Sequence, residues 1–108
     1  MCGIAGILNL DGAPVDRGTL RAMTDAIAHR GPDGEGFHVD REIGLGHRRL
    51  AIIDLSPAAA QPMLCRSERF ALTYNGEIYN YRELRAELES LGHRFRSSSE
   101  TAVSYTHL

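Results

Sequence analysis

Turns rich in glycine and proline divide this chain into short segments, which restricts it to a fold of short strands and helices. The turns fall within residues 9–12, 31–34, 56–57 and 75–76. Because glycine and proline disfavour the interior of regular elements, each turn ends the element that precedes it. At 108 residues, the chain has room for one small domain with a modest core. No internal repeat, low-complexity tract or linker divides it further.

Charge and composition exclude several classes of function. The 12 basic and 14 acidic side chains give a formal net charge of -2, so the chain has no basic field for nucleic acid. No apolar run approaches the roughly 20 residues of a membrane span, and the first residues lack the basic segment of a secretory signal. The two cysteines lack the paired spacing of a zinc site. We therefore expect a cytoplasmic globular chain that binds neither nucleic acid, membrane nor metal.

Apolar spacing predicts a mixed α and β fold. We expect strands over residues 2–10, 37–39, 43–47, 50–55 and 70–74. A polar turn at Asp40 and Arg41 separates the second strand from the third.

Two helices and the start of a third are predicted from capping residues and apolar stripes. The first helix is capped by Asp16, and its inward stripe is Leu20, Met23 and Ile27. The second starts with a capping box of Asn80 and Glu83, buries Leu84, Leu88 and Leu91, and ends at Gly92. Residues 97–99 resemble the start of a further helix, which the sequence after residue 103 does not continue.

The second residue, Cys2, becomes the N-terminal residue if Met1 is removed, and methionine is normally excised before a small residue. An α-amine has an unperturbed pKa of about 7.7–8.0, so it can act as a general base near neutral pH. A thiol beside such a base is a nucleophile that needs no separate histidine. The alternative is a free cysteine at a frayed chain end, but the apolar segment that follows favours an ordered one. Cys65 lacks this context and is interpreted as a packing residue.

Five motifs follow one another along the chain. They are Cys-Gly-Ile-Ala-Gly at 2–6, His-Arg-Gly-Pro-Asp at 29–33, His-Arg-Arg-Leu-Ala-Ile-Ile-Asp at 47–54, Gln-Pro-Met at 61–63 and Asn-Gly-Glu-Ile-Tyr-Asn at 75–80. Together they resemble the N-terminal glutaminase domain of the glutamine-hydrolysing asparagine synthetases, a class II glutamine amidotransferase. The last motif is closer to this branch than to the amidotransferases of amino sugars or purines. It does not separate asparagine synthetases from relatives that amidate another carboxylate.

The resemblance implies a fold and a reaction. The fold is the N-terminal-nucleophile hydrolase αββα sandwich, two stacked and mainly antiparallel sheets flanked by helices. The predicted elements are compatible with this α+β fold but would not select it. In the implied reaction, Cys2 attacks the side-chain amide of L-glutamine and releases ammonia. Water then hydrolyses the γ-glutamyl thioester to glutamate, and the α-amine of Cys2 transfers protons in both steps.

The resemblance also implies roles for residues that contact glutamine. Asn75 and Gly76 form the oxyanion hole, although an Asn-Gly pair alone is typical of a hairpin turn. Arg49 binds the α-carboxylate, a role that suits a planar guanidinium. Glu77 and Glu100 lie near the substrate ammonium group.

Other residues complete the implied site. Leu50, Ile52 and Ile53 line the pocket. Arg30 and Asp33 support it, and the alternative is that they only stabilise the turn at residues 31–34. Arg48 is expected on the opposite face of a strand from Arg49, as a structural or solvated charge. His47 is expected to be packed or hydrogen-bonded, because the mechanism already has its base.

The sequence departs from the family pattern near its end. Glu100 stands where the resemblance predicts an aspartate, and Ala102 stands where it predicts another acid. We expect residues 1–103 to be the N-terminal part of a class II glutamine amidotransferase domain and residues 104–108 to be a divergent or foreign tail. The synthetase domain, which would bind ATP and Mg²⁺ and activate aspartate, has no counterpart here, so we expect no cofactor in this chain. The resemblance also allows a homodimer at full length.

Three hypotheses follow from these observations. The first is the glutamine-hydrolysing half-site of a larger enzyme. The second is a non-catalytic module that binds glutamine or docks on a synthetase partner, which the intact Cys2 disfavours. The third is a truncated chain that does not fold stably, because a fragment of a two-sheet sandwich exposes apolar faces and unpaired strand edges.

Overall fold

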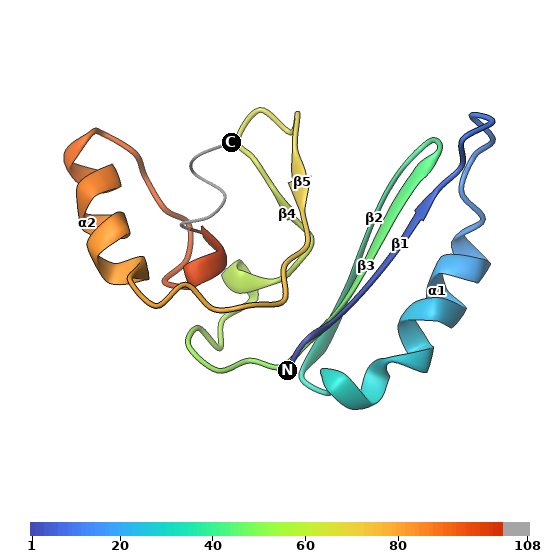
Figure 1. Ribbon diagram of the computed structural model, residues 1–108, viewed down its shortest axis with the longest axis horizontal. Helices are drawn as coiled ribbons and strands as arrows, with labels where there is room; N and C mark the ends of the chain where they lie inside the picture. The colour runs from blue at the N-terminus through green and yellow to red at the C-terminus, as the bar shows by residue number, and fades with distance from the viewer. Residues whose placement is uncertain (103–108) are drawn as a thin grey trace.

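The computed structural model of this protein describes residues 1–102. Within them, a three-stranded and a two-stranded antiparallel sheet lie side by side, and a helix lies at each end of the molecule (Figure 1). Along the longest axis the order is helix α1, the three-stranded sheet, the two-stranded sheet and helix α2 (Figure 1). The described part of the chain therefore has the predicted mixture of antiparallel sheets and helices.

The three-stranded sheet is built from the first half of the chain. Strands β1 (Gly3–Leu8), β2 (Gly34–Asp40) and β3 (Ile43–Arg49) pair in the order β1-β3-β2. A tight turn that contains Arg41, with a φ of 50°, joins β2 to β3. The β1–β3 ladder begins with Gly3 opposite Arg48, so Cys2 directly precedes the first paired residue. These strands confirm the predictions for residues 2–10, 37–39 and 43–47.

Helix α1 (Arg17–Ala26) covers one face of this sheet, and the short 3₁₀ helix η1 (Ala28–Arg30) follows it. Asp16 caps α1 as predicted, because its carboxylate accepts the Thr19 N–H at 3.1 Å. Leu20 is only 1% exposed, but Met23 is 38% exposed and does not belong to the inward stripe. Thr24, one position further on, takes the buried place, where its hydroxyl donates to the Leu20 carbonyl at 2.8 Å.

The second half of the chain has little regular structure. Strands β4 (Met63–Leu64) and β5 (Ala71–Leu72) pair over two residues each, and β5 falls within the predicted strand 70–74. The strand predicted over residues 50–55 is wrong, because this segment is a loop that leads into the 3₁₀ helix η2 (Pro57–Ala59). Side chains of the first half bind this loop and replace the ladder bonds of a strand. Strand β4 had no counterpart among the predicted elements.

Helix α2 (Tyr81–Ser90) follows β5 and lies at the far end of the molecule (Figure 1). It starts after Asn80, but the Asn80 side chain makes no capping hydrogen bond, so the predicted capping box is wrong. Leu88 is buried, whereas Leu91 is largely exposed. Gly92, with a φ of 92°, ends the helix as predicted.

A short helical turn starts at Glu100, directly after the three serines at 97–99 that predicted it. The prediction for residues 104–108 lies outside the described residues. The described part of the chain contains no helix that is long and apolar enough to cross a membrane.

Candidate active site

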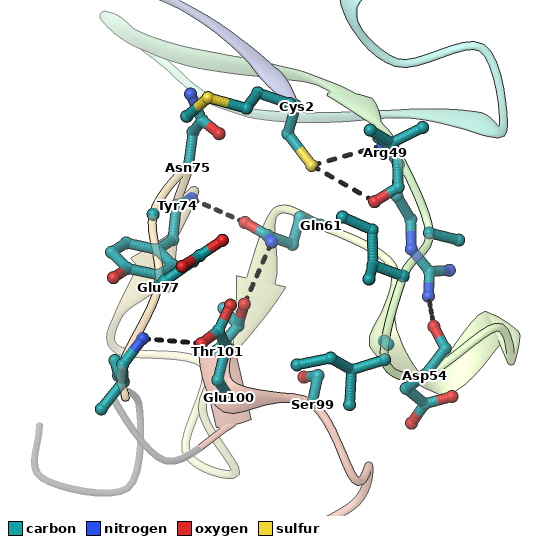
Figure 2. A pocket seen from close by; sticks show the side chains of 18 of the residues that line it. Cys2, Arg49, Asp54, Gln61, Tyr74, Asn75, Glu77, Ser99, Glu100 and Thr101 are labelled. Atoms are coloured by element: carbon teal, nitrogen blue, oxygen red, sulfur yellow. Dashed lines mark hydrogen bonds between the residues drawn. The ribbon is translucent and has the colours of Figure 1, made fainter. Parts of the chain in front are cut away.

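A cavity of about 640 Å³ opens between the Cys2 end of the three-stranded sheet and the loops of the second half. Its walls come from four segments of the chain: residues 1–2, 49–61, 74–81 and 99–101. Figure 2 shows Cys2 and Asn75 at one end of this cavity and Ser99 and Glu100 at the other, with Gln61 between them.

The Cys2 thiol is held against the loop that follows β3. Its sulfur accepts the Leu50 N–H at 3.3 Å, and the S–H lies 3.7 Å from the Leu50 carbonyl oxygen, a weak contact. The Arg30 guanidinium donates to the Cys2 carbonyl at 3.1 Å. The chain end at Cys2 is therefore fixed by its side chain and by its main chain.

Asp33 binds the same loop at the residues on either side of Leu50. Its carboxylate accepts the Ala51 N–H at 2.9 Å, and its own N–H donates to the Arg49 carbonyl at 2.9 Å. Arg30 and Asp33, which the sequence predicted as supporting residues, thus bind the backbone on both sides of the cysteine contact and do not line the cavity.

Arg48 and Arg49 point to opposite faces of β3, as predicted. Arg48 turns toward α1, where it donates to the Thr24 carbonyl at 3.2 Å and forms ion pairs with Asp25 and, at 2.9 Å, with Glu35. Arg49 turns into the cavity wall (Figure 2). Its guanidinium donates to two loop carbonyls, that of Ser56 at 2.9 Å and that of Asp54.

Asn75 and Gly76 lie on the segment that leaves β5, and both are half-buried in the cavity wall. The Tyr74 ring packs over Gly76 so closely that a Cβ there would lie 2.6 Å from the tyrosine oxygen. Only glycine therefore fits at position 76 without displacing Tyr74. The Asn75 side-chain amide and the Gly76 backbone N–H, which no Cβ of its own residue shields, are donors of the kind that an oxyanion site requires.

The cavity carries negative charge at its far end, at Glu100, and partway along the wall that leads there from Asn75, at Glu77 (Figure 2). Glu100 accepts the Ile78 N–H at 2.6 Å, and both Glu77 and Glu100 line the cavity (Figure 2). Burial, followed by the fields of these two carboxylates, raises the pKa of Tyr74 above its ordinary value. A cationic group in the cavity would find its favourable electrostatic position at this end.

The other predicted lining residues form the rim. Leu50 is half-buried beside the cysteine, whereas Ile52 is 73% and Ile53 46% exposed, and all three line the cavity. These residues bring apolar surface to the mouth of the cavity. The predicted site residues other than Arg30 and Asp33 are thus all in its walls.

Two cavity residues, Asp54 and Gln61, were not among the predicted site residues. Asp54 accepts the Ser56 N–H at 2.8 Å, the Ser98 N–H at 2.9 Å and the Ser98 hydroxyl at 3.1 Å. These hydrogen bonds, those from Ser56 first, hold the pKa of Asp54 well below its ordinary value. Asp54 belongs to the motif at 47–54 and Gln61 to the motif at 61–63. The residue type alone does not reveal the role of either one, because that role depends on its hydrogen-bond partners.

His47 is fully buried between the two sheets, as the packed residue that the sequence predicted. Its Nδ1 lies 2.8 Å from the Thr73 hydroxyl, while its Nε2 has no hydrogen-bond partner. Burial, followed by the charge of Arg49, lowers the pKa of His47 to about 4. The imidazole is therefore neutral at physiological pH. Among residues 1–102 there is no group of three or more His, Cys, Asp or Glu side chains that could hold a metal ion.

Comparison with known proteins identifies the family of this chain. A family described as a glutamine amidotransferase domain matches residues 1–107, and the chain belongs to that family. Asparagine synthetase (glutamine-hydrolysing) 1 of Bacillus subtilis (strain 168) is 41% identical over 99% of this chain, and asparagine synthetase 2 of the same organism is 43% identical over 95%. The enzyme of the same name from Triphysaria versicolor is 42% identical over 95%. These findings confirm the resemblance drawn from the five motifs.

The chain spans only a small part of these relatives. It covers 18%, 14% and 17% of the three proteins, respectively. The relatives thus contain a large region that the matched part does not include.

Proposed function

We propose that this chain carries the glutamine-hydrolysing half-site of an amidotransferase of the asparagine synthetase type. The observation that carries the proposal is the cavity that the Cys2 thiol shares with the Asn75–Gly76 donors, with the Glu100 carboxylate at its opposite end. L-Glutamine has a matching arrangement of groups, an amide at one end and an ammonium and a carboxylate at the other.

In the proposed mechanism, removal of Met1 makes the Cys2 amine the general base. The amine takes the thiol proton, and the sulfur attacks the side-chain amide carbon of glutamine. The Asn75 amide and the Gly76 N–H stabilise the negative oxygen of the tetrahedral intermediate. The protonated amine then gives its proton to the leaving nitrogen, so ammonia departs and a thioester remains. Water, activated by the same amine, hydrolyses the thioester to glutamate and restores the thiol.

The rest of the cavity binds the amino-acid part of glutamine. Arg49 binds the α-carboxylate, for which the loop carbonyls of Asp54 and Ser56 have already oriented its guanidinium. Glu77 and Glu100 attract the ammonium group. Glutamate is one methylene longer than the aspartate of the family pattern, and at position 100 its carboxylate already accepts the Ile78 N–H.

We propose that the ammonia released at this cavity is used for an amidation in another part of the protein. The relatives are asparagine synthetases, which supports asparagine synthesis as the destination of the ammonia. We propose that the ammonia amidates aspartate in an ATP-dependent reaction. In this proposal, residues 1–103 form the N-terminal part of the glutaminase domain of a cytoplasmic enzyme, with the αββα sandwich as its complete fold. ATP and Mg²⁺ belong to the synthetase domain, and no step at the cavity of this chain uses them.

Glutamate release by the purified chain tests the proposal. Cys2→Ala should lower the rate by about 10⁴-fold or more, because the covalent route is lost. Cys65→Ala is the matched control, since Cys65 lies outside the cavity walls, and it should keep the rate. Both variants should first show the cooperative circular dichroism melt of the parent chain.

Mass spectrometry tests the identity of the nucleophile separately. The parent chain should lack Met1 and should gain one 6-diazo-5-oxo-L-norleucine adduct, located on residue 2. A folded chain that binds glutamine but releases no Cys2-dependent glutamate would contradict the proposal and would favour a non-catalytic binding module instead.

A further inference from the structure

The Gln61 side chain joins the two ends of the cavity. Its amide oxygen accepts the Tyr74 N–H at 2.6 Å, and its amide nitrogen donates to the Thr101 hydroxyl at 3.3 Å (Figure 2). Tyr74 directly precedes Asn75, and Thr101 directly follows Glu100. One side chain therefore ties the segment of the oxyanion donors to the segment of the acidic end.

The bond to Thr101 is buried, and the bond from Tyr74 is partly buried. Gln61 is 9% exposed and Thr101 is 5% exposed. A buried amide that loses a partner keeps its desolvation cost, about 1–3 kcal/mol, so each bond strongly favours its present geometry. Because an amide group is planar and of fixed size, the two bonds hold Tyr74 and Thr101 at a fixed separation.

The main chain of Gln61 packs closely against the three-stranded sheet. A Cβ on Gly36 of β2 would overlap the Gln61 carbonyl oxygen, so this peptide group lies directly on the three-stranded sheet. Gly36 pairs with His47 in the neighbouring strand. The amide thus extends from the regular half of the molecule and reaches two loop segments, 13 and 40 residues further along the chain.

We propose that Gln61 is a positioning residue that sets the distance between the oxyanion donors and the acidic end of the cavity, and so selects for the length of the amide substrate. This inference rests on the proposed function. L-Glutamine and L-asparagine carry the same groups and differ by one methylene, about 1.3 Å in extended length. A displacement of about 1 Å costs on the order of 100-fold in rate when the reacting groups are otherwise aligned, so a fixed distance discriminates between the two amides.

Three substitutions separate the two bonds. Gln61→Met keeps the length of the side chain but removes both bonds. Thr101→Val removes only the bond at the acidic end, and Thr101→Ser keeps the hydroxyl. Ser90→Ala is a control, because the Ser90 hydroxyl bonds only the Glu87 carbonyl at the exposed end of α2.

In steady-state kinetics with glutamine and asparagine, the substitution at Gln61 should mainly change kcat, whereas Thr101→Val should mainly change KM. For glutamine, Gln61→Met should lower kcat by about 10- to 100-fold, because Asn75 and Gly76 lose their fixed position. Thr101→Val should raise KM by about 5- to 10-fold with kcat within about twofold, because the Tyr74 bond remains, and Thr101→Ser should recover most of that KM. The ratio of kcat/KM for glutamine to that for asparagine should fall at least about fivefold in Gln61→Met.

Two further measurements distinguish positioning from general damage. Alkylation of Cys2 by iodoacetamide needs no oxyanion site, so Gln61→Met should keep the parent rate. Hydrogen exchange of the Tyr74 amide should be slow in the parent chain and in Thr101→Val but faster in Gln61→Met.

The outcomes distinguish this inference from the proposed function. Absence of Cys2-dependent hydrolysis in the parent chain would contradict the proposed function. Hydrogen exchange of the Tyr74 amide would still show whether Gln61 holds this segment. Normal hydrolysis with unchanged kcat and amide ratio in Gln61→Met would overturn the positioning role alone. Parallel losses of alkylation, melting temperature and kcat would also overturn it, because they indicate a merely structural residue.

Discussion

The two halves of the molecule are held together in different ways. Residues 1–49 form a helix and three strands, with continuous ladders from Gly3 to Leu8 and from Gly34 to Arg49. Residues 50–102 contain one helix, α2, but only two strands of two residues each. The loops of this half are held largely by bonds between side chains and distant main-chain groups. The Cys2 thiol belongs to the first half, whereas the Asn75 and Gly76 donors and the carboxylates of Glu77 and Glu100 belong to the second.

Each half fixes its functional groups in its own way. Cys2 directly precedes the β1–β3 ladder, in which many equivalent bonds fix the strand, and it adds single bonds to Leu50 and Arg30. Asn75 and Glu100 depend on a few single bonds, so one substitution can displace them. Regular structure and long-range side-chain bonds should therefore respond differently to mutation, and the following experiments test that expectation.

Truncation of one leucine in each half should give the largest contrast. Leu20→Ala removes a side chain that is 1% exposed between α1 and the sheet, and it should lower the free energy of unfolding by about 2–5 kcal/mol. Leu88→Ala removes the same atoms from α2, where the original side chain is 4% exposed, and should cost less because few regular elements surround it. Urea denaturation measures both. Equal losses would contradict the expected difference between the two halves.

Two asparagines separate effects on rate from effects on stability. Asn75→Ala should lower kcat for glutamine by about 10²- to 10³-fold with little change in melting temperature, because it removes an oxyanion donor. Asn9→Ala removes a side-chain bond of 2.9 Å to the Ala13 carbonyl in the first half, and should lower the melting temperature but keep kcat. A full rate in folded Asn75→Ala would eliminate the proposed oxyanion role.

His47, which joins the halves through Thr73, should make stability depend on pH. Its pKa is lowered from 6.5 to about 4, so the folded state binds the proton more weakly than the unfolded state. The stabilisation is complete above about pH 6.5 and is lost as the pH falls toward 4, with a slope of up to about 1.4 kcal/mol per pH unit. His47→Asn, whose amide can replace Nδ1 toward Thr73, should flatten this part of the curve, and His38→Gln on β2 should not. An unchanged slope in His47→Asn would assign the pH dependence to other groups.

The smallest effect is expected at Asp54, which ties two loops of the second half to each other. Asp54→Ala should speed hydrogen exchange at residues 97–102 while the three-stranded sheet keeps its protection. Asp11→Ala is the matched control in the first half, since Asp11 accepts only the nearby Ala13 N–H at 3.0 Å. Equal exchange rates at residues 97–102 in the two variants would show that Asp54 does not order this segment. In the parent chain, acid should loosen this tie only well below the usual range of an aspartate, because hydrogen bonds lower the pKa of Asp54.

The same division explains how much of the molecule the sequence predicts. The strand before residue 9, the β2–β3 hairpin and the Asp16 cap follow from signals within a few residues of each other, and all three are confirmed. The loop at 50–55 has the composition of a strand but depends on side-chain bonds to its backbone from distant Cys2 and Asp33, which local patterning does not reveal.

The candidate site shows the same limit. The chemistry of Cys2 follows from its position in the chain, and the order of the motifs led to Asn75 and Arg49. Gln61 was missed, because its role depends on partners 13 and 40 residues away. A side chain that acts only by joining distant segments leaves no pattern of spacing in the sequence.

In the proposed mechanism, the removal of Met1 is a maturation step for the cavity. Met1 lines the same cavity as Cys2, and it is 70% exposed while the Cys2 carbonyl is fixed by Arg30. If Cys2 is the nucleophile, the unprocessed chain is a zymogen with a pro-segment of one residue, because Met1 both occupies the wall and converts the catalytic amine into an amide. A single cleavage then provides the base and opens the wall together, so the timing of that cleavage decides when the chain becomes active.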